Sequence, residues 1–231
     1  MKLKYFLGAT LWLMSSWASA GDPEENFAKE EPDPEVAVAQ VNAALTALQT
    51  KEIPAAVLEA AQGFMLIPKM TTGGFVVTAS KGEGLITVRN DNQWSPPVFI
   101  TLSGAGAGLK AGYKSGSVVL VFTNPEKLKN TLSGNLKFGA DIGVSVGPKT
   151  VAAGTDNILN ADVYDYSDES GLFAGVGVEG TGVEVNEARN QGLYGKDFKV
   201  DTILAGQVNP ATEAGKTAVN NLQALLAKHT Q

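Results

Sequence analysis

One run of sequence carries the architecture of this chain: Ser103-Gly-Ala-Gly-Ala-Gly-Leu-Lys-Ala-Gly-Tyr-Lys-Ser-Gly-Ser-Val-Val-Leu-Val-Phe-Thr123. Small polar and apolar residues alternate along it, glycine returns every few positions, and its end is rich in valine. Period-two alternation and β-branched residues predict strands, whereas each glycine would cost a helix about 1 kcal/mol. This run is therefore predicted to be β structure.

The same texture returns in residues 136–148 and 171–180, and the segment from Gly104 to Gly182 holds 15 of the chain's 26 glycines. Glycine inside strands marks bends, bulges or close approach of two backbones, which a small and strongly curved sheet needs. We therefore predict a mainly β (α+β) fold: a curled, barrel-like antiparallel sheet with flanking N- and C-terminal helices.

Apolar residues at helical spacing mark both ends of the predicted domain. They predict an amphipathic helix over residues 35–51 and a C-terminal helix over residues 211–228. The polar side of the first helix carries no lysine or arginine before Lys51. A helix that lies on a membrane surface is usually basic there, so packing on the sheet is favoured, although insertion into a membrane stays an alternative.

Shorter elements complete the expected order. Further helices are predicted at residues 54–62, 125–132, 186–191 and 200–204, and further strands at 64–68, 74–79, 84–89 and 98–102.

The first 20 residues resemble a secretory signal peptide. Lys2 and Lys4 precede an apolar run, and Ala18-Ser19-Ala20 has the small-x-small pattern of a cleavage site. The apolar run is shorter than the ~20 residues of a spanning helix, which disfavours an uncleaved anchor. We expect cleavage near Ala20 and a periplasmic or secreted protein of a bacterial cell.

Composition predicts three segments: a signal peptide over residues 1–20, a disordered acidic leader over 21–34, and a single domain over 35–231. The formal net charge is −6, and residues 21–35 hold seven acids against one lysine. The folded part is therefore nearly neutral, so broad electrostatic attraction to nucleic acid or to an anionic membrane is not expected. The chain has no cysteine, which excludes disulfides, a thiol nucleophile and cysteine-based metal sites.

Two features associated with catalysis or cofactor binding lack the surrounding sequence that such a function needs. Gly175-Val-Gly-Val-Glu-Gly180 matches the G-x-G-x-x-G pattern, but a strand pattern follows it where a nucleotide site needs the start of a helix. The single histidine, His229, is the third residue from the end of the sequence, which argues against a triad or a multi-histidine metal site. We expect no nucleotide, cofactor or metal ion.

Carboxylates are the remaining reactive groups. Asp162, Asp165, Asp168 and Glu169 alternate with tyrosines, and a second group consists of Glu179 and Glu184. This pattern favours the wet face and turn of a hairpin. Whether the cluster Asp162/Asp165/Asp168 binds a cation is left open, and an enzyme would need two of these carboxylates to converge in a pocket.

The ordered motifs of the chain resemble the SYLF domain family, over about residues 54–195. The resemblance rests on this series: Ile67-Pro68, Gly73-Gly74-Phe75, Gly84, Asn92-x-Trp94-Ser95-x-Pro97, Gly104-Ala-Gly-Ala-Gly108, Val118 to Thr123, Val144-x-Val146-Gly147-Pro148, Tyr164-x-Tyr166-Ser167, Gly171-Leu-Phe-Ala-Gly175 and Tyr194-Gly195. It implies a lipid-binding domain related to the yeast actin-bundling proteins, here in a bacterial exported member. The acidic leader and the lack of lysine on the first helix depart from the basic surface of the eukaryotic members.

We therefore expect a non-catalytic module that binds phospholipid and associates peripherally with the cell envelope. Charge and position select Lys69, Lys81, Lys110 and Lys114 as the lipid-contacting residues. The alternative is an envelope structural or protein-interaction module without lipid affinity, whose mark would be an exposed apolar patch or sheet edge without a basic rim.

Overall fold

The computed structural model describes residues 30–74, 77–91, 93–107, 112–132, 137–138, 141–148, 161–168 and 180–229. Residues 32–231 cluster as one compact unit, separate from residues 1–31. The expected signal peptide and most of the acidic leader lie outside the described residues, so the proposed division of the chain stays a prediction.

Within the described residues, eight strands form the sheet of this unit: β1 (Gly63–Gly74), β2 (Val77–Asn90), β3 (Gln93–Trp94), β4 (Val98–Ala107), β5 (Gly112–Phe122), β6 (Ser145–Val146), β7 (Val163–Asp165) and β8 (Thr181–Val185). Their order is β6-β7-β5-β1-β2-β4-β8, with β3 paired to β2 off this path. All pairs are antiparallel except β6–β7, which is parallel. The predicted mainly β (α+β) class is confirmed.

The sheet curls without closing. Beyond β8, isolated bridges join Lys137 to Gly182 and Phe138 to Ile142, which leads toward β6. Within the described residues these single bridges do not become a continuous ladder, so the two ends of the sheet approach each other as in a barrel but remain separate.

A β-bulge interrupts β1 at Ile67 and Pro68. The register shifts there against both neighbours, β2 and β5. Gly84 lies opposite the bulge, and a Cβ at this position would collide with the carbonyl oxygen of Leu66. Glycine is therefore required for close approach of two backbones, as the glycine-rich sequence predicted.

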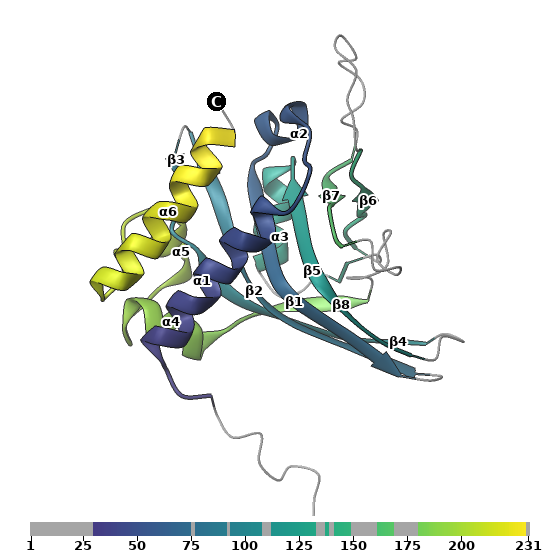
Figure 1. Cartoon of the computed structure of the whole chain (residues 1–231), viewed down its shortest axis with the longest axis horizontal. Helices are drawn as coiled ribbons and strands as arrows, with labels where there is room; N and C mark the ends of the chain where they lie inside the picture. Colours follow the sequence, from purple (N-terminus) through teal and green to yellow (C-terminus); the bar gives the residue numbers. More distant parts are fainter. Residues whose placement is uncertain are drawn as a thin grey trace, which may run out of the picture. The chain divides into compact units, whose positions relative to one another are not determined.

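In the part of the chain that the structure describes, six helices flank the sheet: α1 (Pro34–Gln49), α2 (Ala55–Glu59), α3 (Pro125–Leu132), α4 (Glu187–Tyr194), α5 (Val200–Leu204) and α6 (Glu213–His229). They agree with the predicted helices to within a few residues. Figure 1 shows α1 and α6 lying side by side, and both contribute to one apolar core with the sheet. Among the described helices, none has the length and apolar character needed to cross a membrane.

The central strands are buried on both faces, because two apolar layers enclose them. Phe64 and Leu66 of β1 pack toward α1, α2, α4 and α6, whereas Met65 and Ile67 pack into a second core that includes side chains of α3 and α5. Val119 and Val121 of β5 alternate with Val118, Leu120 and Phe122 in the same way. This explains the continuous apolar runs in the sequence.

Helix α1 packs on the sheet through Ala37, Val41, Ala44 and Leu48, which are buried. Its first turn is capped by Asp33, whose carboxylate accepts hydrogen bonds from the backbone amides of Glu35 (2.8 Å) and Val36 (3.2 Å). The packing alternative for this helix, rather than insertion, is the arrangement observed.

The position of α4 is fixed by a buried amide, Asn190. Its Oδ1 accepts from the backbone N–H of Phe99 at 3.0 Å, and its Nδ2 donates to the carbonyl of the same residue at 2.9 Å. The side chain thus imitates a neighbouring strand along β4. Arg189, the preceding residue on α4, is held by this contact beside the sheet.

Candidate functional site

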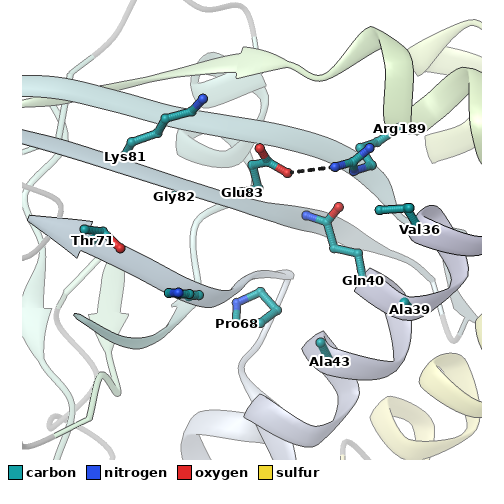
Figure 2. A pocket seen from close by; sticks show the side chains of 11 residues that line it. Val36, Ala39, Gln40, Ala43, Pro68, Thr71, Lys81, Gly82, Glu83 and Arg189 are labelled. Carbon is teal, nitrogen blue, oxygen red and sulfur yellow. Dashed lines mark hydrogen bonds and ion pairs between the residues drawn. The ribbon is translucent and has the colours of Figure 1, made fainter. Parts of the chain in front are cut away.

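A groove of about 680 Å³ opens between α1 and the β1–β2 hairpin. Figure 2 shows the α1 side chains facing the two strands, with the end of α4 beyond them. Its lining residues come from three places in the chain: Val36, Ala39, Gln40 and Ala43 on α1; Pro68, Lys69, Thr71, Lys81, Gly82 and Glu83 on the hairpin; and Arg189 on α4.

The hairpin residues of the groove share one face of the sheet because of their register. Lys69 pairs with Glu83 and Thr71 pairs with Lys81, so their side chains lie on the same side. Met70, between the two β1 residues, points to the opposite face and is fully buried in the second core. A Cβ on Gly82 would come within 2.5 Å of its sulfur, so glycine there makes room for methionine.

The helix side of the groove is lined by small residues. Ala39 and Ala43 are exposed and one turn apart, with Gln40 between them. Larger side chains at these two positions would fill the space between the helix and the hairpin. The groove therefore exists because alanine occupies the positions that face Pro68 and its neighbours.

Two exposed lysines supply positive charge at the groove. Within the described residues, neither Lys69 nor Lys81 has an ion-pair partner. Arg189 differs, because its guanidinium lies 3.5 Å from the carboxylate of Glu83 and only 13% of its side chain is exposed. The site thus combines two available cations with one cation that already bridges α4 to β2.

Gln40 adds an unsatisfied acceptor. Its Oε1 is buried and has no hydrogen-bond partner among the residues that the structure describes, and Figure 2 shows the side chain extending from α1 between Pro68 and Glu83. A buried amide oxygen without a donor costs free energy, which a bound hydroxyl or amine would recover.

The structure brings together two of the four lysines selected from the sequence. Lys69 and Lys81 line the groove, whereas Lys110 lies outside the described residues. The backbone of Lys114 pairs with Thr72 in the β1–β5 ladder, and its side chain is not among those that the structure describes. Sequence reasoning missed Arg189 and Gln40, because a lone arginine and a lone glutamine on helices carry no signal before the packing of α1 and α4 is known.

The acidic cluster lies elsewhere, and Asp165 departs from the wet face that was expected, whereas the side chains of Asp162 and Asp168 are 43% and 44% exposed. Asp165 is only 4% exposed. Its Oδ1 accepts from the backbone amide of Ser167 at 2.9 Å and from the Ser167 hydroxyl, while its Oδ2 has no partner within the described part of the chain. Burial raises the pKa of the Asp165 carboxyl, and the hydrogen bonds from Ser167 and the charge of Lys51 only partly oppose this.

Asp168 forms a different kind of contact. It accepts from the Lys51 ammonium, whose side chain is 6% exposed, and from the amide (2.9 Å) and hydroxyl (2.8 Å) of Ser117. Burial works against the charged form, but the hydrogen bonds from Lys51 and Ser117 hold the pKa of Asp168 below its ordinary value. This network joins the end of α1 to β5.

The acids do not converge on one point. Asp162 accepts from Asn124 at 2.8 Å, beside α3, while Asp165 and Asp168 are held by the serines and Lys51. Glu184 is exposed on β8, and Glu169 and Glu179 lie outside the described residues. Among the residues that the structure describes, no cluster of histidines and acids could hold a metal ion.

Comparison with known proteins assigns a family to this fold. Residues 103–228, more than half of the chain, match the family described as "Ysc84: Las17-binding protein actin regulator". The chain is 32% identical over 169 residues to SH3 domain-containing YSC84-like protein 1 of Xenopus laevis, which covers 71% of this chain and 50% of that protein. It is 33% identical over 164 residues to LAS seventeen-binding protein 3 of Saccharomyces cerevisiae, with coverages of 68% and 36%.

These matches show that the chain belongs to the Ysc84/SYLF family, as its motifs suggested. The chain spans half or less of the length of these relatives. No solved structure matches it. The description of this family names protein binding and regulation, and it names no catalytic activity.

Proposed function

We propose that this protein is a non-catalytic phospholipid-binding module that associates peripherally with the bacterial cell envelope. The observation that carries the proposal is the groove between α1 and the hairpin, where an apolar helix face stands beside Lys69 and Lys81, two exposed cations without an ion-pair partner among the described residues. The signal-like leader supports the location.

The physical basis is a set of weak contacts that act together. A lysine ammonium forms charge-assisted hydrogen bonds to a lipid phosphate, and apolar groups are driven from water into the acyl region. Two lysines give modest attraction, so we expect reversible association. Catalysis is not part of the proposal, because the described carboxylates are held apart.

Vesicle co-sedimentation tests this function. The exported protein should pellet with vesicles of anionic phospholipid more than with zwitterionic vesicles. The variant Lys69→Glu/Lys81→Glu should lose most of this binding. The matched control is Lys129→Glu/Lys228→Glu, which makes the same change in charge at exposed positions away from the groove. Equal loss in both variants, or no binding by the unmodified protein, would refute the proposal.

A second candidate is a protein-interaction module without lipid affinity. Two observations favour it: the family description names a Las17-binding protein, and large apolar side chains are exposed on the sheet, with Tyr113 70% and Val146 58% exposed. If the protein does not bind vesicles, cross-linking of the exported protein in intact cells should capture an envelope protein. The variant Tyr113→Ser/Val146→Ser should abolish that capture.

A further inference from the structure

We infer that the groove takes the single chain of an anionic monoacyl lipid, with the chain against α1 and the phosphate between Lys69 and Lys81. This inference rests on the proposed function, since it names a ligand for the same groove. It makes a separate claim, however, because one lipid molecule must leave the membrane and enter the protein.

The apolar part of the groove has the shape of one chain. Val36, Ala39 and Ala43 recur at helical spacing, so they form a single stripe about 10 Å long on one face of α1. Pro68 faces this stripe from the bulge of β1 (Figure 2). The volume, about 680 Å³, lies in the range of small-ligand pockets, roughly 300–1,000 Å³. A stripe of small side chains this narrow has the width to cover one acyl chain.

The charges at the two ends of the groove set the direction in which the acyl chain lies. Figure 2 shows Thr71 and Lys81 at one end of the groove and the Glu83–Arg189 pair at the other, with the Gln40 amide beside that pair. At the Glu83–Arg189 end the arginine already contacts a carboxylate, 3.5 Å away, so a phosphate bound there would gain the least electrostatic stabilisation. At the Thr71–Lys81 end a phosphate meets lysine ammonium groups, which suit it as point charges.

Gln40 narrows the class of head group. Its buried Oε1 requires a hydrogen-bond donor, and a phosphate that is fully ionised offers none. The free hydroxyl of a glycerol unit between the chain and the phosphate would supply it. A monoacyl glycerophosphate therefore satisfies the apolar stripe, the two lysines and the amide together.

Calorimetric titration with monoacyl glycerophosphates below their micelle concentration tests the inference. With the full exported protein, affinity should rise by about fourfold per added methylene and then stop rising once the stripe is covered. Glycerol phosphate without a chain, inorganic phosphate, and a neutral monoacylglycerol should each bind at least tenfold more weakly. No binding of the monomeric lipid, or a rise without a plateau, overturns the inference.

Variants locate the ligand. Ala39→Leu/Ala43→Leu fills the groove at exposed helix positions and should reduce affinity by at least tenfold. Asn42→Leu/Thr46→Leu, two exposed positions of α1 that do not line the groove, is the matched control and should bind normally. Gln40→Met should remove the preference for glycerophosphate over an alkyl phosphate of equal chain length. Equal loss in the groove-filling and control variants also overturns the inference.

The two proposals fail separately. Binding to vesicles without binding of monomeric lipid refutes the single-chain ligand and leaves membrane association standing. Binding of monomeric lipid without binding to vesicles supports the groove ligand and refutes the peripheral membrane function. Absence of both refutes both.

Discussion

Asn190 shows how one buried side chain can position a whole element. Its amide satisfies both backbone groups of Phe99, and its Nδ2 also lies 2.8 Å from the carbonyl of Asn186. Because β8 ends at Val185, just before this helix, the amide takes over where the ladder along β4 stops. Nothing in the sequence distinguishes this asparagine from the exposed ones, so its role follows only from the fold.

Asn190→Leu should lower the free energy of unfolding by about 1–3 kcal/mol, since the buried backbone N–H of Phe99 would lose its partner, whereas the Phe99 carbonyl keeps the backbone amide of Asn186 at 2.9 Å. Urea unfolding followed by circular dichroism measures the change. Asn220→Leu, at an exposed position of α6, is the control and should stay within about 0.5 kcal/mol of the unmodified protein. Equal effects of the two changes would show that the amide bonds to Phe99 contribute little.

The Lys51–Asp168 pair gives a pH-dependent prediction. Asp168→Asn should cost about 1–2 kcal/mol at pH 7, a value reduced because 44% of the Asp168 side chain is exposed and partly screened by water. The folded-state pKa of Asp168 is lowered, so its stabilisation is present above the unfolded-state pKa and is lost as pH falls through the folded-state pKa.

The difference between Asp168→Asn and the unmodified protein should therefore shrink below about pH 4. Unfolding titrations at several pH values test this. Asp165 should behave in the opposite way, since its pKa is raised: the protonated form favours folding, and stability falls as pH rises from the unfolded-state pKa toward the folded-state pKa. A gap for Asp168→Asn that is constant from pH 7 to pH 3 would contradict the role given to its charge.

At the level of elements, the sequence predicted the helices well and the strands less completely. Helix caps and apolar spacing are local signals, and α1, α3 and α6 match them. The predicted strand at 64–68 underestimated β1, which extends over 12 residues, and the two strands predicted at 74–79 and 84–89 both overlap the single strand β2 of 14 residues. The alternation breaks at Pro68, and the glycine-rich outer parts lack the apolar side chains on which the prediction depended.

Gly84 tests the bulge at this break. Gly84→Ala should lower the free energy of unfolding by about 1–3 kcal/mol, because the new Cβ meets the backbone of Leu66, which cannot yield as a flexible side chain would. Gly182→Ala, in strand β8, is the matched control, since a Cβ there meets nothing within 4 Å. Thermal unfolding of both variants decides the matter, and a neutral Gly84→Ala would show that the bulge can relax.

At the scale of the whole molecule, the order of strands was beyond sequence reasoning. β1 pairs with β5, and β4 with β8, because of long-range packing that no local pattern encodes. The candidate site depends on this arrangement: residues 36–43, 68–83 and 189 meet only after α1 and α4 have packed. Charge alone could select Lys69 and Lys81, but it could not show that they border a groove.

The exported protein lacks Lys2 and Lys4, so its net charge is more negative than the −6 of the full sequence, and this charge predicts a maximum in the salt dependence of vesicle binding. At about 0.01 M salt, where the Debye length is about 30 Å, the whole chain repels an anionic surface, while near 0.1 M only local contacts remain effective. Binding should therefore be strongest near 0.1 M and weaken both below it and toward 1 M. Sedimentation across this range measures it, and a steady rise toward low salt would instead indicate a larger basic surface.

The bulge in β1 decides which face of the sheet each following side chain of the strand occupies. Leu66 faces the helices and Met65 faces the second core, so uninterrupted alternation would send Lys69 into that core and Met70 toward α1. The one extra residue reverses this phase. The charge of the groove therefore depends on the bulge as well as on the identity of the residues: straightening β1 without removing a residue would exchange the lysine for a methionine there, whereas deleting Pro68 would remove the extra residue and leave both on their present faces.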